Sequence, residues 1–487
     1  MKAVYLLCVS VQLTCSVVAA AQELVPSPPS RSAANATGDA AAPAALAALV
    51  AELREQLAEQ RELIARNAAE IAAQRAVLVE LQRQVGGAPI APAAVNQQTA
   101  SASTVHRQDP ELPQKFVAAG EFPGSIEIPG TDAAFKIGAQ ARSTLVHSLA
   151  PLGADDRFIT SSIPVGDERP AEEARTVYTA APSRLNFDLR SPSPFGGVRT
   201  FVEYDFSGSG NAAHLRHAFI QSRRWIFGQT WSTFSDPEAK PTDIDFEGLN
   251  AISLFRQAQI RYTRPVREGL SLSLAAENPA PDLSGAVGVN LTPDFVGRLR
   301  WDPAHPVDEL ITNVAHVQGA VLLRTLRGAL ADQPQTTLTT GGVGVNVSGV
   351  LVPKWDRNAQ VKFATNNGWG IGRYIKDLEA LGGQDAVYDP ATGQLRALAV
   401  ASGYIGYEWR WKPWLQSGLT YGVVNVSTLG IQADTALKRT QRTSISLTWL
   451  PMPHAELIGE FLFGERVNKS GEHNTSSQIQ AGWKLRF

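Results

Sequence analysis

The sequence of 487 residues has only two cysteines, and only 18% of its residues are charged. So little cysteine excludes a small scaffold held together by disulfide bonds. The 44 Lys and Arg residues nearly balance the 46 Asp and Glu residues and leave a net charge of −2, so no nucleic-acid partner is predicted. At 44% hydrophobic residues, the chain is nevertheless too apolar to be wholly disordered.

Both cysteines, Cys8 and Cys15, fall in an N-terminal segment with the pattern of a secretory signal. Lys2 is followed by an apolar run over residues 3–18 and then by small residues, as at a signal peptidase site. Acylation of either cysteine, as in a lipoprotein, is the less favoured alternative because the residues before each cysteine match a lipoprotein signal poorly. We predict a signal peptide over residues 1–21 and a mature chain without cysteine.

Long hydrophobic runs are missing from the rest of the chain. A helix that crosses a membrane needs roughly 18 or more consecutive apolar residues, and no such run follows residue 21. The sequence therefore excludes a helical membrane protein and leaves secreted, periplasmic or outer-membrane destinations.

Residues 45–85 have the periodicity of a coiled coil. Apolar residues recur at every seventh position, and a further apolar row widens this face, which favours three helices over two. The flanking segments 22–44 and 86–119 are rich in Ala, Pro and Ser without periodicity, as is typical of linkers. An Ala-rich single helix packed on the protein itself is the alternative. The predicted coiled-coil core consists of Val50, Leu57, Ile64, Ile71, Leu78 and Val85.

From residue 120 to residue 487 the hydrophobic period changes from seven to two. The last predicted strand has Ile479, Ala481 and Trp483 on one face, and Gln478 and Gln480 on the other. One face suits lipid and the other suits water. The same alternation recurs in the segments 135–142, 184–190, 198–205, 257–262, 270–274, 298–301, 402–411 and 442–449. We predict an all-β transmembrane antiparallel barrel over residues 120–487, preceded by a periplasmic coiled-coil helix.

The connections between these segments are alternately short and long. Short turns with Pro or Gly occur at 191–197, 264–269, 302–307, 352–354, 412–413 and 451–453, and longer polar stretches at 148–180, 232–255, 278–294, 325–338, 366–397, 425–437 and 464–475. Outer-membrane barrels have short periplasmic turns and long external loops, whereas a soluble β-sandwich buries large aliphatic residues between shorter strands. The segments predict about sixteen strands, and an even number returns both ends of the barrel to the periplasm.

Aromatic residues support a place in the outer membrane. Trp and Tyr concentrate at membrane interfaces, and several flank the predicted short turns. Trp483, Leu485 and the terminal Phe487 resemble the signal that the outer-membrane barrel assembly machinery recognises. We predict a barrel in the Gram-negative outer membrane, in contact with lipid and lipopolysaccharide.

A barrel of this size encloses an aqueous channel, so the question becomes which solutes pass. The third loop, residues 232–255 between the fifth and sixth predicted strands, contains five acidic residues, and Phe234 and Phe246 are placed to fix it to the wall. If the loop folds inward, its carboxylates would face arginines of the lumen and create a transverse field. A surface loop with solvated acids is the alternative. The acidic residues of this predicted constriction loop are Asp236, Glu238, Asp243, Asp245 and Glu247.

Basic residues outnumber acidic ones at the predicted inward positions, and arginine supplies a permanent charge with a planar fork that matches a carboxylate. The sequence therefore predicts a pore that prefers small anionic solutes. Two inward arginines, Arg298 and Arg300, lie on one strand.

Several short segments resemble one known family. They are Gly124-Ser125, Pro129-Gly130-Thr131, LRHAF at 215–219, GQTWSTF at 228–234, DFEG at 245–248 and RQAQIRY at 256–262. The chain resembles the DcaP-like trimeric porins of Gram-negative outer membranes. This resemblance implies a homotrimer of sixteen-stranded channels with a basic constriction, associated with uptake of small anions such as dicarboxylates. Carried onto this sequence, the implied site draws on Arg142, Arg184, Arg199, Arg216, Arg256 and Arg261.

The sequence departs from the family in long Ala- and Gly-rich loops such as 376–397, so specificity for one acid does not transfer. Enzyme activity, a cofactor and a metal are not predicted. His214 and His217 lie three apart, which on a regular strand places them on opposite faces. A different kind of function remains open: a tether to the cell wall, in which about 41 helical residues would reach roughly 60 Å into the periplasm.

Overall fold

The computed structural model describes residues 120–150, 152–166, 174–194, 196–303 and 312–487. All of them belong to the second of two compact units, residues 109–487. The signal peptide, the linkers and the coiled coil predicted above lie outside the described residues. No helix in the described part of the chain is long and apolar enough to cross a membrane.

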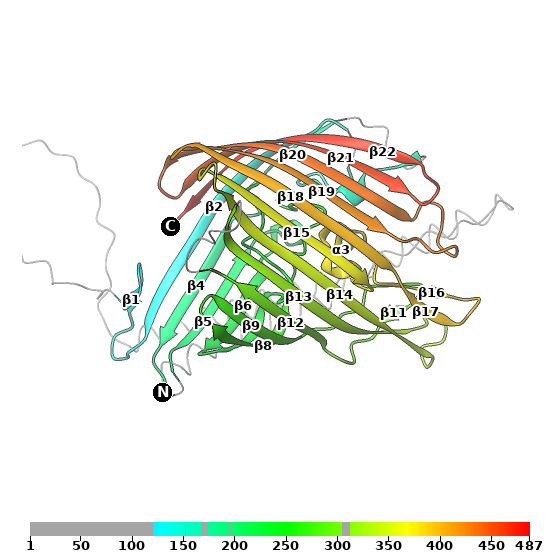
Figure 1. Ribbon diagram of the computed structural model, residues 1–487, viewed down its shortest axis with the longest axis horizontal. Coiled ribbons are helices and arrows are strands. Elements are labelled where there is room, and N and C mark those ends of the chain that lie inside the picture. The colour runs from blue at the N-terminus through cyan, green and yellow to red at the C-terminus, as the bar shows by residue number, and fades with distance from the viewer. Residues whose placement is uncertain (1–119, 151, 167–173, 195, 304–311) are drawn as a thin grey trace, which may run out of the picture. The chain divides into compact units, whose positions relative to one another are not determined.

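Sixteen antiparallel strands form a closed β-barrel (Figure 1). In order around the barrel they are β2 (Ala134–Ser148), β4 (Arg184–Ser191), β5 (Val198–Asp205), β6 (His214–Ser222), β7 (Trp225–Trp231), β8 (Arg256–Arg267), β9 (Leu270–Glu277), β12 (Asp294–Trp301), β13 (Thr312–Ala329), β14 (Thr337–Pro353), β15 (Ala359–Trp369), β18 (Ala399–Lys412), β19 (Leu415–Val426), β20 (Leu437–Met452), β21 (Ala455–Asn468) and β22 (His473–Arg486). The last strand pairs with the first, from Gln140 opposite Arg486 to Ser148 opposite Gln478, which closes the barrel. The predicted fold class is confirmed.

Short elements decorate this barrel. They are β1 (Ile126–Glu127), β3 (Arg175–Thr179), β10 (Leu283–Ser284), β11 (Val287–Gly288), β16 (Ala386–Asp389) and β17 (Gln394–Ala397), the 3-10 helices η1 (Thr160–Ser162), η3 (Ser209–Asn211) and η4 (Gly372–Tyr374), and the α-helix α3 (Lys376–Leu381). β10, β16 and β17 form a separate three-stranded sheet that joins two long loops.

The barrel is apolar outside and polar inside, as the period-two pattern predicts. On β22 the side chains of Ile479 and Trp483 remain 47% and 42% exposed, whereas Gln478 and Gln480 are buried. A soluble sandwich would bury the apolar face instead. The exposed apolar face is therefore the one that suits lipid.

Some strands continue farther than predicted. β13 and β14 extend into residues 325–338, and β21 and β22 extend into residues 464–475, both of which were expected to be loops. Ladder hydrogen bonds come from the backbone and do not need an apolar face, so pairing continues into the polar sequence beyond the apolar band. The connections that remain there are residues 330–336 and 469–472.

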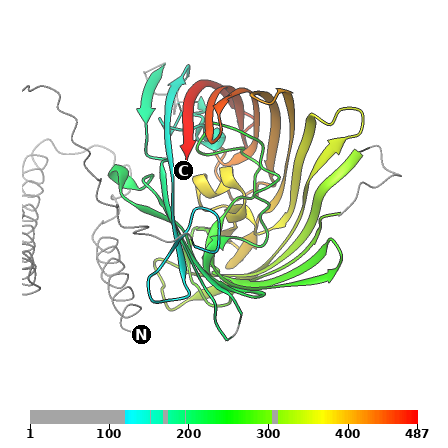
Figure 2. The ribbon, with the colours of Figure 1, turned by 90° about the vertical axis from the view of Figure 1, so that its left-hand side faces the viewer.

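Two long connections fold into the barrel: the third loop, residues 232–255, and the sixth loop, residues 370–398. Figure 2 shows both, with the yellow helix α3, inside the ring of strands. Together they build a small apolar core in the lumen from Phe234, Leu249, Ile252, Ile371, Tyr374, Ile375 and Leu378. Inward-facing glycines give these loops room, because a Cβ atom on Gly422 or Gly406 would collide with Asn250 or Pro241 of the third loop.

Candidate functional site: a basic cavity in the lumen

The third loop is fixed to the inner wall by hydrogen bonds from its backbone. The amides of Ile244 and Asp245 donate to Glu460 Oε2 on β21 at 2.9 and 3.3 Å. Tyr404 on β18 donates its hydroxyl to the carbonyl of Ala239 at 3.1 Å. A loop inside a barrel has to satisfy its own backbone groups, and inward polar side chains of the wall supply the partners.

The first two acidic residues of this loop, Asp236 and Glu238, bind side chains of the barrel wall. Asp236 accepts from His316 Nε2 and from the hydroxyl of Ser348, each at 2.9 Å. Burial raises the pKa of Asp236, but the interactions with His316, Ser348 and Arg300 together outweigh burial and bring the pKa below its ordinary value. Glu238, which is 66% exposed at its side chain, pairs with Arg300 at 2.6 Å.

The other three acidic residues of the loop also have cationic partners: Lys240 for Asp243, Arg442 for Asp245 at 2.9 Å, and Lys376 for Glu247 at 3.2 Å. Burial raises the pKa of Glu247, and Lys376 offsets only part of this effect. The negative charges of these three carboxylates are thus largely compensated by their cationic partners, and the ion pairs hold the loop in place.

A cavity of about 610 Å³ lies between this loop and a wall formed by β22, β2, β4, β6, β7 and β8. Four of the eight predicted pore arginines line it: Arg142, Arg184, Arg216 and Arg256. Among the described residues, its lining has nine cationic side chains against four acidic ones, Asp243, Asp245, Glu247 and Glu379. The cavity is therefore strongly basic.

The four arginines differ in how far their charge is compensated. Arg216 is paired twice, with Glu203 at 2.8 Å and with Asp205 at 2.6 Å. Arg184 reaches Glu203 only at 4.0 Å, and its Nε has no hydrogen-bond partner among the described residues.

Arg142 and Arg256 have no acidic partner within 4 Å in the part of the chain that the structure describes. Arg142 donates instead to the carbonyl of Ile244, and the guanidinium of Arg256 lies over the ring of Trp231 at 4.9 Å. A carbonyl and an aromatic face position a guanidinium without cancelling its charge. Arg142 and Arg256 thus present uncompensated positive charge to the cavity, and the charge of Arg184 is only weakly compensated.

A β-bulge changes the orientation of the LRHAF segment. Along the β5–β6 pair, the register shifts between Glu203, which faces His217, and Tyr204, which faces Leu215. The extra residue brings His214 and His217 to the same face, so the expectation that they lie on opposite faces is wrong. They still bind different partners: His214 contacts Asp205 at 3.1 Å and His217 contacts Thr230 at 3.1 Å. Within the described residues, no group of three or more potential ligands is placed to hold a metal.

The other four predicted arginines do not line this cavity. Arg199 pairs with Asp188 at 2.9 Å, near the short-turn end of the barrel. Arg300 pairs with Glu238 at 2.6 Å and with Asp302 at 2.8 Å. Arg261 and Arg298 are partly buried on β8 and β12, where Arg298 donates to the hydroxyl of Ser273 at 3.1 Å.

Sequence reasoning missed three cationic residues of the cavity: Arg157, Lys240 and Lys376. All three lie in loops, where no alternation shows which side chains point inward. Lys376 begins α3 and bridges Glu247 at 3.2 Å and Glu379 at 2.9 Å. Burial lowers the pKa of Lys376, but the two carboxylates outweigh burial and raise it. Helix α3 therefore completes the cavity on the side of the sixth loop.

The family can now be assigned. The model of the DcaP outer membrane protein family matches residues 155–484. The chain belongs to this family. The DcaP-family barrel is similar to the solved outer membrane channel DcaP of Acinetobacter baumannii, with 20% identity, a TM-score of 0.64, and coverage of 76% of this chain and 100% of that one.

Two further solved structures are similar to this chain at lower scores. The anion-selective porin from Comamonas acidovorans is 10% identical with a TM-score of 0.49, and covers 73% of this chain and 100% of its own. The trimer form of OmpT of Vibrio cholerae is 12% identical with a TM-score of 0.44, at 73% and 99% coverage. No curated protein matches the chain. Family and fold together make this DcaP-family protein an outer-membrane porin that forms a channel.

Proposed function

We propose that this porin is a homotrimer whose channels pass small hydrophilic solutes and favour anions such as dicarboxylates. The observation that carries the proposal is the surplus positive charge of the large cavity. Among the described residues, Arg142 and Arg256 have no acidic partner within 4 Å and Arg184 reaches Glu203 only at 4.0 Å, while the acids beside them are paired. A surplus of fixed positive charge in a narrow, low-dielectric passage raises the local concentration of anions.

Dicarboxylates suit this arrangement better than anions with a single charge. A guanidinium binds a carboxylate through two parallel hydrogen bonds, and the cavity offers more than one guanidinium with free donors. A solute with two carboxylates can therefore engage two arginines at once. The arginines Arg199, Arg261, Arg298 and Arg300 would contribute mainly to the field, since they lie outside the cavity.

Reversal potentials across a planar bilayer test the preference for anions. In a potassium chloride gradient, the reconstituted channel is expected to show the potential of an anion-selective pore. Combining Arg184→Gln with Arg256→Gln should move the reversal potential toward that of an unselective pore, while Arg264→Gln, an exposed arginine of β8 outside the cavity, should leave it unchanged. Clear cation selectivity of the unaltered channel would refute the proposal.

The trimer is supported by the heptad pattern of residues 45–85 and by the resemblance to trimeric porins. In the same proposal, residues 1–21 direct export, the coiled coil lies in the periplasm, and Trp483, Leu485 and Phe487 serve as the assembly signal on the outer face of β22. Chemical cross-linking of the protein in isolated outer membranes, followed by denaturing electrophoresis, measures the oligomer directly, and a band of three subunits is expected.

A further inference from the structure

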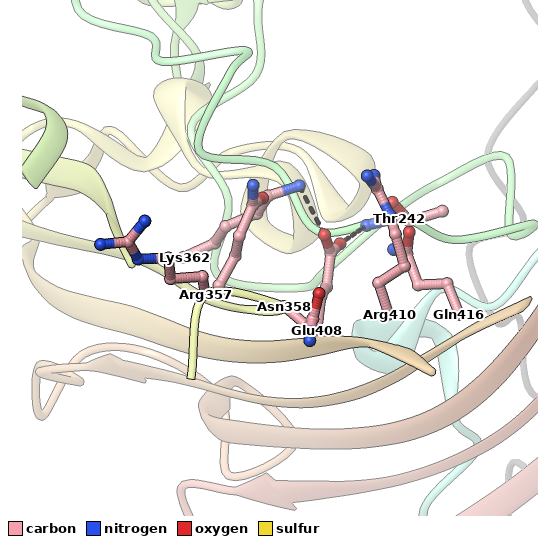
Figure 3. Close-up of a pocket in the computed structure, with 8 residues that line it drawn as sticks. Thr242, Arg357, Asn358, Lys362, Glu408, Arg410 and Gln416 are labelled. Carbon is pink, nitrogen blue, oxygen red and sulfur yellow. Dashed lines mark hydrogen bonds and ion pairs between the residues drawn. The ribbon is translucent and has the colours of Figure 1, made fainter. Parts of the chain in front are cut away.

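A second cavity, of about 240 Å³, lies at the short-turn end of the barrel. Its lining comes from the turn between β14 and β15, from inward side chains of β15, β18 and β19, and from Thr242 of the third loop (Figure 3). No described residue lines both cavities, although Lys240 and Asp243 on either side of Thr242 belong to the larger one. The strip of third loop from 240 to 243 therefore borders both cavities.

Of the described residues that line this second cavity, one is acidic, and its charge is compensated. Glu408 pairs with Lys362 at 2.9 Å and accepts a hydrogen bond from the amide of Thr242. Lys362 also donates to the carbonyl of Lys240 at 3.2 Å, so both partners of the ion pair are tied to the third loop. The Lys362–Glu408 pair thus carries no net charge and forms part of the lining of the cavity.

Two arginines lie beside the Lys362–Glu408 pair, and no described carboxylate compensates their charges. Arg357 and Arg410 lie on either side of the Lys362–Glu408 pair in Figure 3. In the described chain, neither guanidinium has an acidic partner within 4 Å or a hydrogen bond to another side chain. Because both side chains are exposed and unpaired, they are available to a solute.

The remaining lining is made of neutral hydrogen-bonding groups. The side-chain amides of Gln360 and Gln416 point into the same space and make no hydrogen bond to other described residues. Each amide offers two N–H donors. A site with two free guanidiniums, free amide donors and no free carboxylate is complementary to an oxyanion.

We propose that this cavity is a binding subsite for small dicarboxylates at the periplasmic mouth of the channel, separate from the basic cavity above the third loop. The volume sets the size of the solute, since drug-sized ligands occupy sites of roughly 300–1,000 Å³. A dicarboxylate of malonate size fits the smaller space. This assignment goes beyond the proposed function because it adds a second site that is built from other residues.

Calorimetric titration of the full-length detergent-solubilised protein with malonate tests the subsite. The unaltered protein is expected to show two classes of site. Combining Arg357→Gln with Arg410→Gln should weaken one class by about tenfold or more, which corresponds to the loss of charge-assisted hydrogen bonds, and should leave the other class within about twofold. Neither substitution breaks an ion pair of the described structure, so the barrel should fold normally.

Two controls separate the possible outcomes. Arg267→Gln removes an exposed charge at the same end of the barrel but outside the cavity, and it should leave both classes of site unchanged. Arg184→Gln with Arg256→Gln should weaken only the class that belongs to the large cavity, so a failure of the proposed function is visible independently. An unchanged isotherm for the Arg357 and Arg410 variant, or an equal loss with Arg267→Gln, would overturn the subsite.

Discussion

Arg216 and Arg256 line the same cavity, but their surroundings differ. Arg216 is held by Glu203 and by Asp205, whose side chain is fully buried. Arg256 contacts the ring of Trp231 and has no acidic partner within 4 Å among the described residues. The two arginines therefore have different roles. Arg216 holds the bulge of β6 in place, and Arg256 presents its charge to solutes.

This difference predicts that the two arginines contribute unequally to the free energy of unfolding. Arg216→Gln leaves a buried carboxylate without its ionic partner, and breaking a buried pair in this way costs about 3 kcal/mol or more. Arg256→Gln breaks no ion pair and should leave the free energy of unfolding nearly unchanged. Equilibrium unfolding of the barrel refolded in lipid, monitored by tryptophan fluorescence, measures both. Equal stability of the two variants would contradict this division of roles.

At the scale of elements, the channel is narrowed by two loops that pack on glycines of the wall. A Cβ atom on Gly344 would come within 2.9 Å of Ile371 in the sixth loop, and one on Gly422 would collide with Asn250 in the third loop. Asn250 also donates to Thr440 at 3.0 Å. The packing of these loops thus depends on glycines, which leave space beside the wall, as much as on hydrogen bonds.

Gly422→Val should displace the third loop from the wall. The added side chain occupies the place of the Asn250 amide, and overpacking of this kind typically costs about 1–3 kcal/mol. A displaced loop should make the single-channel conductance noisier and change its mean value. Gly319→Val is the matched control, because nothing lies within 4 Å of the Cβ position on that strand. Quiet channels of unchanged conductance for Gly422→Val would show that the loop does not depend on this contact.

The strands were predictable from the sequence because lipid on one side and water on the other impose a strict period of two. The acidic and aromatic residues of the third loop indicated that it folds inward, but the partners that fix the loops were not predictable, because they lie far away in the chain: Asp245 binds Arg442, and Lys376 binds Glu247. The Ala- and Gly-rich stretch 376–397 carries no period at all, so its insertion beside the third loop left no signal. The bulge before His217 likewise arises from pairing with β5, not from local sequence.

At the scale of the whole molecule, the barrel and the predicted coiled coil make separate contributions. Every contact of the large cavity described above lies within residues 120–487. The heptad pattern of residues 45–85 predicts a different role for that segment, which is to hold subunits together or to attach the membrane to the cell wall. Conductance and attachment are therefore expected to depend on different parts of the chain.

Deleting residues 22–115 while keeping the signal peptide distinguishes these two roles. If the protein is a porin trimerised by the coiled coil, the truncated channel should conduct as before, and its trimers should dissociate at a lower temperature in detergent.

Point substitutions test the same role of the coiled coil. Ile64→Ser with Ile71→Ser removes two predicted core residues and should also lower the temperature at which the trimers dissociate, whereas Glu55→Ser with Glu62→Ser changes the opposite face of the helix and should not. Loss of attachment of the outer membrane to the cell wall, with trimer stability unaltered, would instead establish the tether. Solute flux and membrane attachment have to be scored separately in the same cells, because only their combination tells the two roles apart.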